Sequence, residues 1–184
     1  MSGKRLNLFF ALFPDEKTGQ QLEALAEHLH DVHDLNGKPF RADRFHLSLH
    51  NLGEDVRVPN EVVDAAGRAA ASIELEPFHL CFDRALSFAG STGRRPLVLP
   101  PAEGGHALVA FYRQLGAALK EEGLGRFVSF DFMPHITLFY ADRLVEEHPV
   151  KPISWTVNEF SLVVSHVGEG RYDLIGQWLM RGSA

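Results

Sequence analysis

Two short segments of the chain carry side chains in the same order, which is histidine, apolar, hydroxyl, apolar. Residues 46–49 read His-Leu-Ser-Leu and residues 135–138 read His-Ile-Thr-Leu. Because side chains alternate across a β-strand, each histidine would share one face with the hydroxyl two residues later, while the apolar side chains point to the other face. Two such pairs facing each other would supply a general acid, a general base and two neutral hydrogen-bond donors, which suits phosphodiester chemistry.

Each of these residues also has a purely structural explanation. A single histidine on a strand is more often a surface residue or a hydrogen-bonded core residue, and serine and threonine are common in strands for packing reasons. The repetition of the whole tetrad in the same apolar frame favours a catalytic role for His46 and His135. By the same argument, Ser48 and Thr137 are candidates for binding a phosphate.

The segments around the tetrads predict the order strand, helix, histidine-bearing strand twice. The apolar residues 6–13 predict a buried strand, and helical spacing predicts a helix from Asp15 to about residue 33. A second helix is expected over residues 105–122, between a strand and the second tetrad. Further expected elements are a helix after Pro59 and strands over residues 76–88, 155–165 and 172–180. We therefore expect one domain over residues 1–184 with an internal duplication.

Composition and charge narrow the classes of function. The chain has 184 residues and a formal net charge of −6, which argues against a broad, nonspecific grip on a nucleic-acid backbone but allows a small basic pocket. The single cysteine, Cys81, excludes an internal disulfide framework and is expected to pack in the core. The apolar residues 6–13 are too few to span a bilayer, so we expect a cytoplasmic protein with no membrane contact.

The tetrads resemble the paired His-x-(Ser/Thr)-x motifs of the 2H phosphoesterase superfamily, in particular its bacterial 2'-5' RNA ligase-like branch. The likeness extends to four flanking segments: residues 8–14, 45–53, 132–138 and 165–178. The resemblance implies an α+β fold of two pseudo-symmetric lobes, each an antiparallel sheet with helices outside. It also implies an active-site cleft between the lobes.

The resemblance also implies a function. Members hydrolyse 2',3'-cyclic phosphates of RNA ends or nucleotides to 2'-phosphates without a metal or cofactor, and some join 2'-5' RNA linkages in the reverse direction. By this analogy His135 would be the general base and His46 the general acid, with Ser48 and Thr137 donating to the nonbridging phosphate oxygens. The expected partner is a small nucleotide or an RNA terminus, with no obligate protein partner.

One position departs from the family pattern. The branch often has arginine five residues after the second histidine, where this chain has Tyr140. A cation for the phosphate must then come from elsewhere, and the candidates are Arg41, Arg44, Arg94, Arg95 and Arg171. Strict alternation places His50 and Phe139 on the active faces, where they could contact substrate, although His50 could equally lie at the rim and core packing is the simpler role for Phe139. Tyr140 would point away from the site unless the strand bulges.

Three alternatives stay open at this point. The same site could act on another small nucleotide phosphodiester, such as a cyclic ADP-ribose phosphate or a 2'-5' oligonucleotide, and Tyr140 and the acidic charge favour a small substrate over long RNA. A catalytically silent nucleotide-binding module is a second interpretation, against which both intact tetrads count. A metal-dependent phosphatase is disfavoured because no carboxylates cluster beside the histidines, and the spacing of His28, His30 and His33 suits metal ligation poorly.

Overall fold

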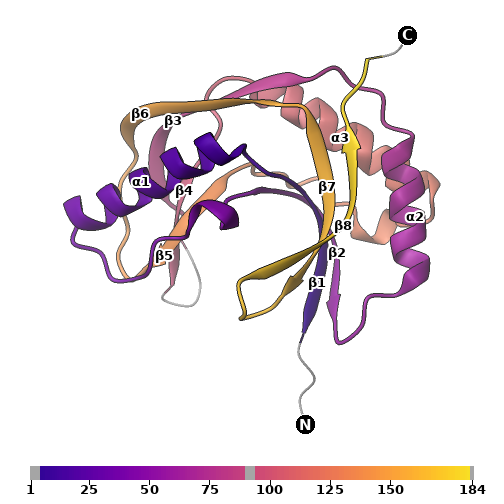
Figure 1. Ribbon diagram of the computed structural model, residues 1–184, viewed down its shortest axis with the longest axis horizontal. Helices are drawn as coiled ribbons and strands as arrows, with labels where there is room; N and C mark the ends of the chain where they lie inside the picture. Colours follow the sequence, from indigo (N-terminus) through magenta and orange to yellow (C-terminus); the bar gives the residue numbers. More distant parts are fainter. Residues whose placement is uncertain (1–4, 90–93, 183–184) are drawn as a thin grey trace.

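The computed structural model describes residues 5–89 and 94–182. Within these residues, eight strands form one antiparallel sheet with helices packed against it (Figure 1). In chain order the strands are β1 (Leu6–Leu12), β2 (Leu47–Asp55), β3 (Phe78–Ser87), β4 (Arg95–Leu99), β5 (Ile136–Ala141), β6 (His148–Val157), β7 (Glu159–His166) and β8 (Arg171–Leu179). Across the sheet their order is β6-β3-β4-β5-β2-β1-β7-β8, and each neighbouring pair is antiparallel. The predicted α+β fold is confirmed, and the two expected half-sheets are joined edge to edge by β5 and β2.

The two halves repeat one another across the junction between β5 and β2. In each half a motif-bearing strand lies at the junction, and the strand beside it, β1 or β4, leads into a long helix. These helices are α1 (Glu16–Val32) and α3 (Gly105–Glu121), close to the predicted ranges. The duplicated order of elements is therefore confirmed by the arrangement of the sheet. The remaining helix is α2 (Asn60–Ala71), and short 3-10 turns lie at Ala42–Arg44 and Gly125–Phe127.

Each long helix reaches the half of the sheet on the other side of the junction from the strand that precedes it. Helix α1 follows β1 but contacts β5 and β6, whereas α3 follows β4 and contacts β2 as well as β3 and α2 (Figure 1). Helix α1 begins where it does because the Asp15 carboxylate accepts a hydrogen bond of 2.8 Å from the backbone N–H of Thr18. Its apolar stripe then buries Leu22, Ala26 and Leu29. Because each long helix packs against the other half of the sheet, the two helices connect the two halves.

Residues 155–165, expected as one strand, belong to two strands. Strand β6 ends at Val157 and β7 begins at Glu159, at opposite halves of the sheet. The chain changes halves at Asn158, whose side-chain amide donates to the Thr156 carbonyl at 3.1 Å. The sequence does not reveal this crossover, because buried apolar residues occur at the end of β6 and again from the second residue of β7.

Cys81 lies on β3 and is half-buried. Its partial burial and the charges of Asp83 and Glu103 raise the pKa of its thiol, which makes Cys81 a poor nucleophile.

Within the described part of the chain, none of the helices combines the length and the apolar character needed to cross a bilayer.

Candidate active site

The two tetrads meet at the junction between the half-sheets. Leu47 pairs with Ile136, so an antiparallel register puts His46 across from Thr137 and Ser48 across from His135. The apolar members are buried beneath the sheet, whereas Ser48 is exposed and the other three polar side chains are half-buried. Each hydroxyl therefore lies beside the histidine of the other motif, and the structure brings the four predicted residues together.

Both imidazoles are held by the same kind of backbone contact. Nδ1 of His46 lies 2.9 Å from the carbonyl oxygen of Arg44, and Nδ1 of His135 lies 2.7 Å from the carbonyl oxygen of Met133. A carbonyl oxygen can only accept, so Nδ1 is the nitrogen that carries the proton in each neutral ring. The lone pair then sits on Nε2, which is the nitrogen left to exchange a proton with a substrate.

Aromatic rings enclose the imidazole of His46. The centroid distances are 5.4 Å to Phe9, 5.8 Å to Phe13 and 5.2 Å to Tyr172. Phe88 packs on His135 in the same way, at 5.0 Å. Our sequence analysis missed these rings because no local pattern marks them. Tyr172 reaches His46 only through the pairing of β8 with β7 and of β7 with β1.

The surroundings of His46 favour its neutral form. Burial among the rings lowers the pKa of His46, the hydrogen bond to the Arg44 carbonyl raises it, and the charges of Arg44 and His135 lower it further. The net shift is downward, so in the free protein His46 is neutral near neutral pH. A neutral imidazole is the form that accepts a proton.

Removing the ring of Tyr172 should therefore raise the pKa of His46. In Tyr172→Ala, water reaches the imidazole and the cost of charging it falls, whereas Tyr172→Phe keeps the ring and serves as the matched control. The titration of the His46 ring, followed by NMR, measures the shift directly. Equal titration midpoints in the wild type and in Tyr172→Ala would show that burial by this ring does not set the pKa.

A bulge in each motif strand interrupts the alternation after the tetrad. The register of β2 against β1 shifts between Ser48 and Asn51, and that of β5 against β4 shifts between Thr137 and Phe139. An extra residue in one strand turns the side chains that follow to the other face. His50 and Phe139, expected on the active faces, are instead 1% and 0% exposed.

His50 and Phe139 face the helices. His50 stacks on Tyr112 of α3 with centroids 3.8 Å apart, and its Nε2 lies 2.8 Å from the Tyr112 carbonyl oxygen. Phe139 packs against His30 of α1 at 5.9 Å. The possible substrate contact of both residues is corrected accordingly, and Phe139 has the core-packing role that the sequence analysis gave as the simpler one.

We expect His50→Ala to lower stability rather than activity. The substitution opens a cavity and removes the hydrogen bond to the Tyr112 carbonyl, which should cost about 2–4 kcal/mol in the free energy of unfolding. Burial and the charge of Lys120 lower the pKa of His50, although its hydrogen bond raises it. The contribution of neutral His50 to the stability of the fold is therefore fully present above the unfolded-state pKa and is lost as the pH falls through the folded-state pKa. Urea unfolding at neutral and mildly acidic pH measures both effects. Wild-type stability with lost turnover would instead place His50 in the site.

Arg44 is the cation that borders the catalytic residues. Its charge acts on the pKa of His46, and its Nε is buried without a hydrogen-bond partner among the described residues. A Cβ placed on Gly170, in the β7–β8 turn, would lie only 2.9 Å from Nη1 of Arg44, so a glycine lets this turn lie against the guanidinium. The structure therefore places Arg44 beside the first motif, and its contact with a substrate phosphate stays a prediction.

The other arginine candidates lie farther along the surface. Arg94 is exposed and lies over the ring of Tyr140, with its guanidinium carbon 5.4 Å from the ring centroid. Arg171 lies 3.6 Å from the Asp173 carboxylate and contacts His166. Tyr172, between Arg171 and Asp173 in the sequence, faces His46. Strand alternation therefore turns Arg171 away from His46 and His135, and the expectation that Arg171 borders the site is not met.

No group of three or more metal-ligating side chains is found in residues 5–89 and 94–182. Two of the histidines considered as metal ligands make other contacts. Nδ1 of His30, in α1, lies 3.0 Å from the Asp31 carboxylate, and Nε2 of His33, which follows α1, lies 3.4 Å from Nε2 of His148.

Comparison with known proteins agrees with this geometry. The family model described as the 2'-5' RNA ligase superfamily matches residues 6–169, which include both motifs. The chain belongs to this superfamily. A search of curated proteins finds no match.

Several solved structures are similar to this chain over nearly its whole length. Escherichia coli LigT complexed with NADP+ is 26% identical, with a TM-score of 0.74 over 98% of this chain and 99% of that one. LigT complexed with 3'-AMP is 27% identical, with a TM-score of 0.74 over 96% and 99% of the two chains. The protein TT0787 of Thermus thermophilus is 26% identical, with a TM-score of 0.73 over 97% and 100%.

Proposed function

We propose that the protein is a metal-independent phosphodiesterase that opens the 2',3'-cyclic phosphate of a nucleotide or RNA end and leaves a 2'-phosphate. The observation that carries this proposal is the crosswise pairing of each histidine with the hydroxyl of the other motif. Both proton transfers and the binding of the phosphate oxygens can then come from side chains alone. The complexes of the relative LigT with 3'-AMP and ATP support a nucleotide as the substrate.

In this mechanism water attacks the phosphorus of the cyclic phosphate. One Nε2 takes a proton from the water as the new P–O bond forms, and the other gives a proton to the ribose O3' as the P–O3' bond breaks. The product keeps the phosphate on O2' and has a free 3'-hydroxyl. Ser48 and Thr137 donate hydrogen bonds to the nonbridging oxygens, where negative charge increases in the transition state.

The lowered pKa of His46 supports its use as the base and the use of His135 as the acid during hydrolysis. This allocation is the reverse of the one that the family resemblance implies. When a 5'-hydroxyl replaces water as the nucleophile, the same ring opening forms a 2'-5' linkage and the two histidines keep their roles. The roles exchange only in the reverse reaction, in which O3' attacks the phosphorus and the cyclic phosphate forms again.

A second candidate is the same chemistry on a different nucleotide phosphodiester. The complex of LigT with NADP+ favours it, since that ligand carries more than one phosphate and two nucleoside parts. Both candidates use the same residues and differ only in what lies next to the reacting phosphate.

A substrate panel in EDTA tests the proposal. It contains the four 2',3'-cyclic mononucleotides, an RNA with a 2',3'-cyclic end, a 2'-5' dinucleotide and a cyclic ADP-ribose phosphate, with 2'- and 3'-phosphate products resolved by chromatography. We expect 2'-phosphates from the 2',3'-cyclic mononucleotides and from the RNA with a 2',3'-cyclic end. Turnover of only the last two compounds would favour the second candidate, and no turnover of any compound would overturn both.

A further inference from the structure

A hollow of about 300 Å³ has in its wall Arg44, the cation beside His46, and six of its eight lining residues are basic or aromatic. Its lining residues are Gly37, Lys38, Pro39, Phe40, Arg41, Arg44, Arg94 and Tyr140. Four of these are cations and none is a carboxylate, although the chain as a whole has a formal charge of −6. We call these four, Lys38, Arg41, Arg44 and Arg94, the cation cluster.

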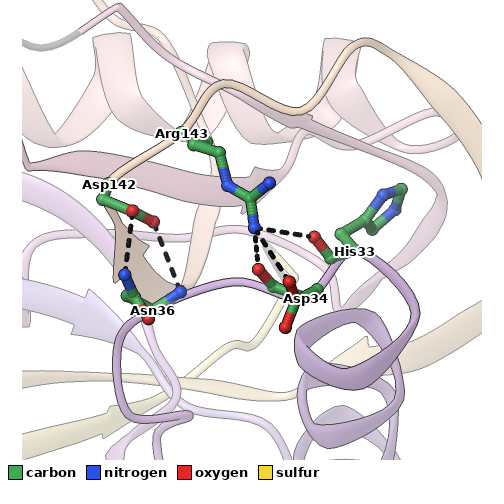
Figure 2. A network of polar contacts seen from close by, with 5 residues as sticks. All are labelled: His33, Asp34, Asn36, Asp142 and Arg143. Carbon is green, nitrogen blue, oxygen red and sulfur yellow. Dashed lines mark hydrogen bonds and ion pairs between the residues drawn. The ribbon is translucent and has the colours of Figure 1, made fainter.

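The wall of this hollow is anchored to the end of β5. The side-chain amide of Asn36 donates to the Asp142 carboxylate at 2.9 Å, and the Arg143 guanidinium reaches the backbone carbonyls of His33 and Asp34 (Figure 2). These contacts join residues more than one hundred positions apart in the chain. The loop that carries part of the cation cluster is therefore positioned before any ligand arrives.

Glycine at position 37 is needed for this packing. Gly37 has a φ of +126°, which is strained for other residues, and a Cβ there would overlap the carbonyl oxygen of Tyr140. The backbone N–H of Phe40 then donates to the Leu138 carbonyl at 3.0 Å. The loop thus lies directly on the bulged part of β5.

Two arginines of the cation cluster are held by aromatic rings. The guanidinium carbon of Arg44 lies 4.4 Å from the centroid of Phe40, and that of Arg94 lies 5.4 Å from the centroid of Tyr140. Stacking occupies the face of a guanidinium and leaves its N–H edges for an anion. No member of the cluster is paired with a carboxylate within the described residues. Cations grouped in a hollow whose lining contains no carboxylate repel one another, and a bound anion would relieve this cost.

Tyr140 and Arg44 connect the hollow to the proposed reaction site. The bulge in β5 puts exposed Tyr140 on the same side of the strand as Thr137, and Arg44 borders both the hollow and His46. We infer that the cation cluster binds a second phosphate group of the substrate, one sugar away from the phosphate that reacts. This inference rests on the proposed function and specifies it further: the preferred substrate carries a 5'-phosphate or an internucleotide phosphate beside its 2',3'-cyclic end.

A binding comparison tests this without relying on turnover. Isothermal titration calorimetry compares adenosine 3'-monophosphate with adenosine 3',5'-bisphosphate, which differ only in the second phosphate. We expect the bisphosphate to bind about 10–100-fold more tightly. Arg94→Gln and Lys38→Gln should reduce this ratio several-fold, while Arg57→Gln, which changes the same charge in a different hollow, should keep it. Equal affinities in the wild type, or an unchanged ratio in Arg94→Gln and Lys38→Gln, would overturn the inference.

Kinetics distinguish the two sources of a second phosphate. The substrates are adenosine 2',3'-cyclic phosphate, its 5'-phosphorylated form and a dinucleotide with a 2',3'-cyclic end. A higher kcat/KM for the 5'-phosphorylated form supports a small nucleotide substrate, and a higher value for the dinucleotide supports an RNA end. Equal values for all three overturn the inference and leave the proposed function intact. Failure of all three to react overturns the proposed function, while the calorimetric ratio still tests the hollow.

Discussion

Replacing either His46 or His135 with alanine is expected to lower kcat/KM for a 2',3'-cyclic nucleotide by about 10²–10⁴-fold. Each imidazole carries one of the two proton transfers, and losing either transfer leaves a step that water performs poorly. The backbone contact of Nδ1 in each motif positions Nε2 for this role. The double variant should be little slower than the slower single variant, because the two groups act in one step. Initial rates at saturating and limiting substrate measure both quantities.

The matched control is His28→Ala, which removes an exposed histidine from α1 and should leave the rate unchanged. Thermal unfolding of each variant separates loss of chemistry from loss of fold. Full activity in His46→Ala or in His135→Ala would refute acid–base catalysis by the pair.

Removing the hydroxyl groups is expected to have the second largest effect, about 10²-fold in kcat for Thr137→Val or Ser48→Ala. Their hydrogen bonds strengthen as charge increases on the phosphate oxygens, so their loss slows the chemical step more than it weakens binding. Both hydroxyls lie beside the histidine of the other motif, where the reacting phosphate must sit. Steady-state kinetics with a cyclic mononucleotide measure the change in kcat and KM separately.

Thr137→Ser and Ser48→Thr keep the hydroxyl and test the shape of the side chain alone. They should retain most of the wild-type kcat. If the valine and alanine variants raised KM and left kcat unchanged, the hydroxyls would only help to bind the ground state.

Local patterns in the sequence predicted the elements well. A helix was expected from Asp15 to about residue 33 and observed as α1 over Glu16–Val32, because an N-cap and an apolar stripe are both local signals. The tetrads likewise have their histidines, hydroxyls and buried apolar residues where strand alternation places them. Local alternation was sufficient here because neither bulge begins before the last residue of its tetrad, so the histidine and the hydroxyl keep a common face.

Features that depend on distant contacts could not be predicted in this way. The bulges that bury His50 and Phe139 are set by pairing with β1 and β4, and one extra residue reverses the face of every side chain after it. Tyr140 consequently lies on the active side, although alternation placed it on the other. The approach of Tyr172 to His46 depends on the order of strands in the sheet.

The central claim is that two histidines direct water to the phosphorus of a 2',3'-cyclic phosphate. The most direct test is a reaction of adenosine 2',3'-cyclic phosphate in 18O-labelled water with EDTA, followed by mass spectrometry of the separated products. The account predicts adenosine 2'-phosphate with one 18O atom in its phosphate, and no such product above background with His46→Ala or His135→Ala. Absence of labelled 2'-phosphate from the wild-type reaction, or its undiminished formation by either variant, would contradict the account.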